Sequence, residues 1–122
     1  MTELLFAYGT LKADFALHYV IQGCTYVGNY KTPAAFKLVD LGAFPALVRS
    51  EKGIEVTGEV YRVDDDILNY LDVIEGVNRG LYTRERVIVH DQKGDTIDVW
   101  AYIANHVGRL SGVEIKSGVW RR

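Results

Sequence analysis

The sequence predicts an α+β domain built on a curled sheet or a small barrel. Segments typical of β-strands dominate the chain, only two segments have the pattern of a helix, and helices do not alternate with strands as they would in βα units. Many strands in such an arrangement favour a sheet that curls on itself. The 122 residues are enough for one domain and no linker-like stretch divides them, so we expect a single domain over residues 1–122.

Seven segments have the composition of strands, with β-branched and aromatic residues bounded by turn-forming residues. They are residues 4–8, 24–30, 35–40, 45–49, 56–63, 81–90 and 96–103. The last segment is the clearest, because aliphatic residues alternate along it with polar and aromatic ones, which predicts that both of its faces pack against something. Residues 91–95 separate the last two strands, and Gly94 is the residue expected to have a positive φ in this hairpin turn.

One segment predicts a strong helix and another predicts a weak one. The weak helix is expected over residues 15–22, and the strong helix lies within VDDDILNYLDVIEGVN, residues 63–78. Asp64 or Asp65 is expected at the N-cap of the strong helix, where acidic residues also suit the positive end of the helix dipole. Gly76 follows directly after the predicted end, as is typical of a helix C-terminus.

Glu75 stands out because it falls on the apolar face of the strong helix. At 100° per residue, Ile67, Leu68, Leu71 and Ile74 form the apolar stripe, and Glu75 falls between Leu71 and Leu68. Burial and the negative end of the helix dipole are both expected to raise its pKa, which suits a general acid or base near neutral pH. The alternative is a glutamate of the last turn whose side chain points out into solvent.

The stretch FAYGTL ends the first strand at Gly9 and Thr10, although no earlier strand exists for a hairpin to return to. Successive backbone N–H groups at such a strand end can point into one space and bind a carboxylate or a developing oxyanion, and Gly9 would let a ligand approach the backbone closely. The alternative is an ordinary turn. Together with one inward carboxylate, this loop predicts a small anionic substrate held by backbone amides beside a single proton-transfer group.

Composition argues against several other function classes. The formal net charge of −2 and the absence of an extended basic patch disfavour nucleic-acid binding. Cys24 is the only cysteine, so no internal disulfide can form; we expect a reducing compartment and a small buried apolar role for this residue. No apolar run approaches a membrane span and no zinc-like or phosphate-loop spacing is present, so we expect a cytoplasmic protein with no membrane partner.

Taken together, these residues resemble the gamma-glutamylcyclotransferase-like superfamily, and most closely its short bacterial and gamma-glutamylamine cyclotransferase branch. The matching stretches are YGTLK at 8–12, FPALV at 44–48, GEVYRV at 58–63, LDVIEG at 71–76, LYTRERV at 81–87, VWAYI at 99–103 and SGVW at 117–120. They follow the family's order over nearly the whole chain, and YGTL with the downstream LDxxEG is the specific part. After YGTLK, however, Asp14 and Leu17 stand where the family commonly has glycine and asparagine, and His18 is retained with a helix-surface position expected for it.

The resemblance implies a small mixed β-barrel with flanking helices, with the YGTL loop and the glutamate at the mouth of the barrel. Backbone groups of Tyr8, Gly9, Thr10 and Leu11 would hold the glutamyl head of the substrate, and Glu75 would be the catalytic acid/base.

The resemblance also implies that Tyr82 and Arg84, which match the family's Tyr-x-Arg element, help to shape the pocket. The reaction would be cyclotransfer on a γ-glutamyl amide or amine, with release of 5-oxoproline and a free amine, and no metal or organic cofactor is expected. Two other classes compete with this reading. A non-catalytic module would bind or sequester a small metabolite in the same pocket, as the altered ADFALHY stretch suggests, and a protein-binding scaffold would have Glu75 as a solvated helix-end residue.

Overall fold

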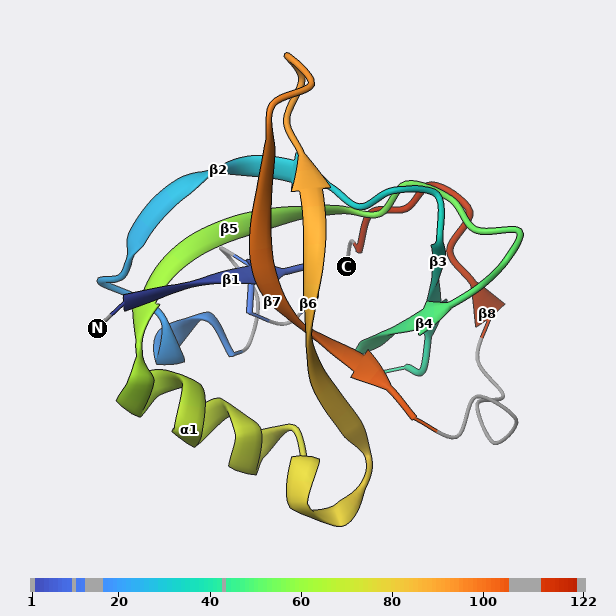
Figure 1. Ribbon diagram of the computed structural model, residues 1–122. Helices are drawn as coiled ribbons and strands as arrows, with labels where there is room; N and C mark the ends of the chain where they lie inside the picture. The colour runs from blue at the N-terminus through green and yellow to red at the C-terminus, as the bar shows by residue number, and fades with distance from the viewer. Residues whose placement is uncertain (1, 10, 13–16, 43, 106–112, 121–122) are drawn as a thin grey trace.

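The structure is a computed structural model that describes residues 2–9, 11–12, 17–42, 44–105 and 113–120. Five strands close into a barrel in the order β1 (Thr2–Ala7), β5 (Thr57–Asp64), β2 (Thr25–Lys31), β6 (Tyr82–His90) and β7 (Thr96–Ala104). A second sheet has the order β4 (Pro45–Arg49), β3 (Phe36–Asp40) and β8 (Val113–Glu114), and lies beside the barrel (Figure 1). The predicted α+β class with a small mixed barrel is confirmed.

Most of the barrel consists of long antiparallel ladders. At two places, however, neighbouring strands pair through only one residue pair each, and these two pairings close the barrel. Leu5 of β1 pairs in parallel with Trp100 of β7, and Lys31 of β2 pairs with His90 of β6. By contrast, β6 and β7 pair along their whole length and β5 pairs with both β1 and β2. The strands β2 and β5 are strongly curved, and the β6–β7 ladder runs across β1, β2 and β5 in the view of Figure 1.

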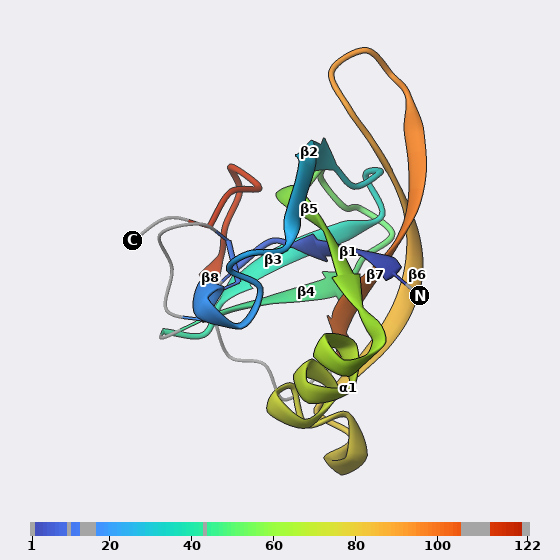
Figure 2. The ribbon, with the colours of Figure 1, turned by 90° about the vertical axis from the view of Figure 1, so that its left-hand side faces the viewer.

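The strong helix forms as predicted and lies across one end of the barrel. This helix, α1 (Asp65–Ile74), begins at the N-cap Asp64, whose side chain accepts a hydrogen bond from the Ile67 N–H at 2.8 Å. Gly76 follows the helix in the left-handed conformation with φ of 67°, and a short 3₁₀ turn, η2 (Val77–Arg79), leads into β6. In both ribbon views α1 lies at the end opposite the β6–β7 turn (Figures 1 and 2).

The predicted weak helix over residues 15–22 is wrong in its described part, since residues 17–22 contain only a 3₁₀ turn, η1 (His18–Val20). Tyr19, Val20 and Ile21 are weak helix formers, and Gly23 ends the run with a φ of 95° before a second helical turn can form. The strand β8 was not predicted. The seven predicted strands are all present, with ends that differ from the predicted ones by at most two residues.

The core has two main parts. They lie on opposite faces of the sheet, because successive side chains along a strand point to opposite faces. Phe6 of β1 and the aliphatic residues of β7 join one cluster with residues of β3 and β4, whereas Leu5 and Ala7 face a second cluster against α1. The strand β7 thus packs its two faces against different clusters, as its alternation predicts. Cys24, expected to be buried, is half-buried at the edge of the second cluster. No helix among the described residues has the length and apolar character needed to cross a membrane.

Candidate active site

A cavity of about 330 Å³ lies where the end of β1 meets the C-terminal end of α1 and the starts of β4 and β6. Its walls are mostly apolar or aromatic and come from segments far apart in the chain. They consist of Phe6, Ala7, Tyr8, Gly9, Leu11, Leu17, Phe44, Pro45, Ile74, Glu75, Leu81, Tyr82 and Tyr102. The fold therefore brings together Glu75, Tyr82 and three of the four residues of the YGTL loop; the fourth, Thr10, lies outside the described residues.

Glu75 is the carboxylate among the described residues that line this cavity. It is the C-cap of α1, where its N–H donates to the Leu71 carbonyl at 2.8 Å, and the chain then leaves the helix at Gly76. Burial raises the pKa of Glu75 to about 7. Near neutral pH this carboxyl can therefore both accept and release a proton.

Three tyrosines, Tyr8, Tyr82 and Tyr102, line the cavity with Glu75. Burial is the main cause that raises the pKa of each phenol, and the charge of Glu75 raises each of them further. All three phenols are thus neutral at physiological pH, and none competes with Glu75 for a proton there. The Tyr8 hydroxyl donates to the Tyr102 carbonyl at 2.7 Å and accepts from the Leu47 N–H at 3.4 Å, so it ties the end of β1 to β7 and β4.

Packing and hydrogen bonds hold the described part of the YGTL loop in place. The Lys12 N–H donates to the Gly9 carbonyl at 2.9 Å, and the Lys12 ammonium donates to the Trp120 carbonyl at 3.0 Å. A Cβ on Gly9 would lie 2.6 Å from Cγ of Pro45, so this glycine is required by the close approach of the loop to β4. His18, expected on a helix surface, is instead half-buried with its Nδ1 at 2.9 Å from the Leu11 carbonyl.

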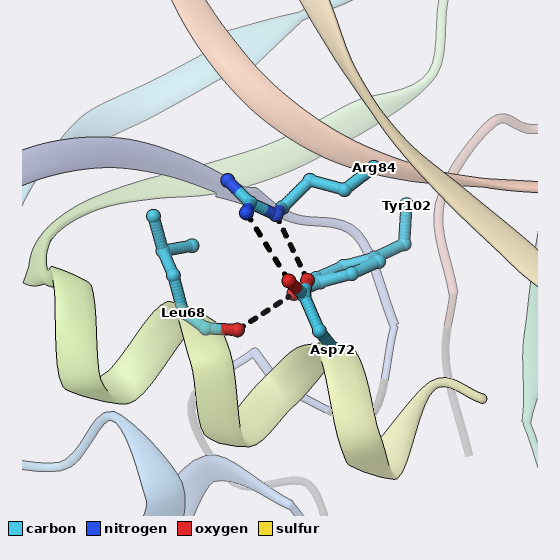
Figure 3. A network of polar contacts seen from close by, with 4 residues as sticks. All are labelled: Leu68, Asp72, Arg84 and Tyr102. Atoms are coloured by element: carbon cyan, nitrogen blue, oxygen red, sulfur yellow. Dashed lines mark hydrogen bonds and ion pairs between the residues drawn. The ribbon is translucent and has the colours of Figure 1, made fainter. Parts of the chain in front are cut away.

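Arg84 is not among the residues that line the cavity. Its guanidinium forms two hydrogen bonds with the Asp72 carboxylate, and the Tyr102 hydroxyl donates to the same carboxylate (Figure 3). Sequence reasoning missed both partners. The aromatic and polar face of the segment 96–103 was a signal for Tyr102. Asp72 was marked as the aspartate of the LDxxEG stretch and as a residue off the apolar stripe, but neither observation identified its partner.

The arrangement can perform proton transfer in a partly water-excluded space. Among the described residues, no group of three or more His, Cys, Asp or Glu side chains is placed to hold a metal ion. A single carboxyl with a pKa of about 7, neutral phenols and the backbone of the YGTL loop surround the cavity. This combination fits acid/base chemistry on a small substrate.

Comparison with known proteins shows what this chain is similar to. A Vibrio cholerae protein named "Putative gamma-glutamylcyclotransferase" is 34% identical over 125 residues, which cover 98% of this chain and 96% of that protein. A Methanocaldococcus jannaschii protein with the same designation is 28% identical, with coverage of 98% and 96%. The crystal structure of an AIG2-like protein from mouse superposes with a TM-score of 0.84 at 27% identity, covering 98% of this chain and 88% of that one.

These relatives support an enzymatic activity of the gamma-glutamylcyclotransferase type for the chain. The family model described as gamma-glutamyl cyclotransferase, AIG2-like, matches residues 5–122, which is nearly the full length. The chain therefore belongs to the gamma-glutamyl cyclotransferase, AIG2-like family.

Proposed function

We propose that the protein converts a γ-glutamyl amide or amine into 5-oxoproline and a free amine, with Glu75 as the only acid/base. The observation that carries this proposal is the position of Glu75, a carboxyl with a pKa of about 7 on the wall of a mostly apolar cavity. Ring closure within one molecule needs no enzyme nucleophile, and a single group that first accepts and then returns a proton is sufficient.

The reaction begins with the substrate's α-amine in its neutral form and Glu75 as the carboxylate. The amine nitrogen attacks the γ-carbonyl carbon, a C–N bond forms, and Glu75 takes the proton that this nitrogen gives up. The protonated Glu75 then donates the same proton to the nitrogen of the departing amine as the original amide C–N bond breaks. The lactam 5-oxoproline and the amine leave, and Glu75 is again a carboxylate.

The glutamyl head would be held by the backbone of Tyr8, Gly9, Thr10 and Leu11. Tyr8, Gly9 and Leu11 line the same cavity as Glu75, which supports this assignment. Backbone N–H groups directed at the γ-carbonyl oxygen or at the α-carboxylate would stabilise developing or fixed negative charge. The role of this segment is thus to keep the glutamyl chain folded so that its own amine reaches its own carbonyl.

The hydroxyl of Tyr82 would assist by hydrogen bonding to the bound substrate. Tyr82 lines the cavity, and burial followed by the charge of Glu75 raises the pKa of its phenol, so the hydroxyl keeps its proton at neutral pH. A neutral phenol can donate to a carbonyl oxygen without adding charge to the cavity.

The test is release of 5-oxoproline from a panel of γ-glutamyl amino acids, γ-glutamyl amines and γ-glutamyl-lysine, measured by mass spectrometry. Wild type should form product from at least one class, and Glu75→Gln should lose at least about 100-fold in kcat, because the general acid and base are removed together. Asp66→Asn is the matched control, since Asp66 is an exposed carboxylate in the first turn of the same helix.

Near-normal turnover by Glu75→Gln would remove Glu75 from the mechanism. Absence of product from wild type on the whole panel, together with a ligand that copurifies and is retained in the cavity, would favour the metabolite-binding module instead. The panel also identifies the class of amine that leaves.

A further inference from the structure

A partly buried ion pair joins α1 to the barrel. The Asp72 carboxylate accepts from the Arg84 Nε at 2.8 Å and from its Nη2 at 3.1 Å, which is a two-point contact. The Tyr102 hydroxyl donates to Asp72 Oδ1 at 2.7 Å and lies 3.4 Å from the Leu68 carbonyl oxygen. The side chains of Arg84 and Asp72 are 23% and 24% exposed, so water weakens this pair less than it weakens a fully exposed one.

The two donors come from neighbouring strands at one level of the sheet. Arg84 of β6 and Tyr102 of β7 are direct cross-strand partners, so they form one rigid platform. The acceptor, Asp72, lies three residues before Glu75, which is just under one helical turn. The ion pair thus connects the last turn of α1 to the β6–β7 ladder immediately before the helix ends.

The other contacts of α1 with the barrel fix the helix less specifically. Leu68 and Leu71 are buried between helix and barrel, but apolar contacts are non-directional and allow small shifts of the helix along its axis. A planar guanidinium that grips both oxygens of a carboxylate has a narrow geometry. In the part of the chain that the structure describes, Arg84–Asp72 is the ion pair that connects α1 to the barrel.

We propose that Asp72 and Arg84 are positioning residues for Glu75: their ion pair holds the last turn of α1 on the β6–β7 ladder and so keeps the Glu75 carboxyl inside the cavity. Neither residue lines the cavity, and each acts through the helix rather than on the substrate. The kinetic part of this inference rests on the proposed function, whereas the part that concerns the placement of Glu75 does not.

The first readout is the pKa of Glu75 itself, measured by NMR from the side-chain carbonyl carbon of ¹³C-labelled glutamate, with Glu75→Gln to assign the signal. The variants are Asp72→Asn and Arg84→Met. If the pair acts by position, both should expose Glu75 and lower its pKa from about 7 by at least about one unit. If the pair acted through charge alone, Asp72→Asn would lower this pKa, whereas Arg84→Met would leave the Asp72 charge uncompensated and raise it.

The charged and titratable groups around Glu75 allow this distinction. Tyr8, Tyr82 and Tyr102 face the cavity with Glu75 and stay neutral throughout the titration, because the pKa of each phenol is raised mainly by burial. The charged groups nearby are Asp72, which is on α1 itself, its partner Arg84 of β6, and Arg79 of η2, whose Nη2 would lie 3.1 Å from a Cβ on Gly76. The substitutions change only the first two.

A third variant, Arg84→Lys, keeps the positive charge but loses the bidentate hydrogen bonding to Asp72. It should behave like the other two, in a milder form. It also keeps the test decisive if Asp72→Asn or Arg84→Met fails to fold.

Arg86→Met is the matched control. Arg86 lies two residues further along β6, pairs with Asp98 at 3.3 Å and stacks on Trp100 at 4.9 Å, much as Arg84 stacks on the same ring at 4.5 Å. Its ion pairs do not involve α1. This control should therefore leave the pKa of Glu75 and the turnover unchanged.

The second readout is steady-state 5-oxoproline formation well below the unfolding temperature of each variant. Asp72→Asn and Arg84→Met should lower kcat by about 10- to 100-fold, while KM changes by less than about threefold. A misplaced proton-transfer group raises the barrier of the chemical step more than it weakens substrate binding. A merely structural role would lower the unfolding temperature and leave kcat per folded molecule unchanged.

Opposite shifts of the Glu75 pKa in Asp72→Asn and Arg84→Met, or wild-type values of pKa and kcat in Arg84→Lys, would overturn the proposal. If wild type itself forms no product from the panel, the proposed function fails while the NMR titration still decides whether the ion pair places Glu75.

Discussion

Replacement of Glu75 by glutamine is expected to stabilise the folded protein above neutral pH and to leave its stability near about pH 4 nearly unchanged. Burial raises the pKa of Glu75 from its ordinary value of 4.5 to about 7. Because one pH unit corresponds to about 1.4 kcal/mol, holding the ionised carboxyl in the cavity costs roughly 3 kcal/mol of folding free energy. That is a sizeable fraction of the total stability of a small domain.

The sign follows from which state binds the proton more tightly. Between about pH 4.5 and pH 7 the folded state keeps the Glu75 proton while the unfolded state has lost it, so the free energy of unfolding falls as the pH rises through this window. Below about pH 4.5 both states carry the proton and no penalty exists. Above about pH 7 the penalty is complete. Glutamine has nearly the same shape and stays neutral at every pH, so the variant avoids the penalty.

The assay is urea unfolding of wild type and Glu75→Gln at half-unit intervals from about pH 4 to pH 8.5. All other groups titrate in both proteins, so the difference between the two unfolding free energies isolates Glu75. This difference should be near zero at the acid end and grow to roughly 3 kcal/mol in favour of the variant by pH 8. Asp66→Asn controls for the loss of a helix carboxylate. A difference that stays constant across the whole range would refute the reasoning, because it would mean that Glu75 is not held in a dry environment.

Three further substitutions test the packing around the cavity. Gly9→Ala places a Cβ 2.6 Å from Cγ of Pro45, so it should cost about 1–3 kcal/mol by overpacking and raise KM by moving the loop; unchanged KM in steady-state assays would count against a substrate-binding role for the loop backbone. Gly94→Ala meets no atom within 4 Å but has a φ of 88°, so it should lose about 1–2 kcal/mol in urea unfolding with kcat and KM intact. Tyr8→Phe removes the 2.7 Å hydrogen bond to the Tyr102 carbonyl and should cost about 1–3 kcal/mol; unaltered thermal unfolding would show that water replaces the hydroxyl.

The features that the sequence predicted well are those that a single segment determines. The period of one helix is sufficient to place Glu75 on the buried side of α1, and the N-cap Asp64 and the left-handed Gly76 follow from local rules for helix ends. The raised pKa was expected from burial and from the helix dipole together. Burial is the cause that the structure gives.

The features that sequence reasoning missed depend on contacts between distant segments. The strand β8 contains only two residues, Val113 and Glu114, and pairs with β3 more than seventy residues earlier in the chain. Nothing local distinguishes so short a strand from a loop. In the same way, Arg84 and Asp72 both lie in stretches that carry the resemblance, but their contact was not predicted, since the angle at which α1 crosses the β6–β7 ladder decides which carboxylate this arginine meets.

The Arg84–Asp72 pair has no net charge, so it can hold the helix end without lowering the raised pKa of Glu75. A lone cation placed beside the end of α1 would also anchor the helix C-terminus, where positive charge is favoured. It would, however, stabilise the ionised form of Glu75 and pull the pKa of that carboxyl back toward its ordinary value. Arg84 is instead matched by Asp72, and the pKa of Glu75 is raised by burial alone. A neutral ion pair therefore fixes the orientation of the helix, while the burial of Glu75 alone sets the pKa of its carboxyl. For this reason, loss of either partner should change the Glu75 pKa in the same direction.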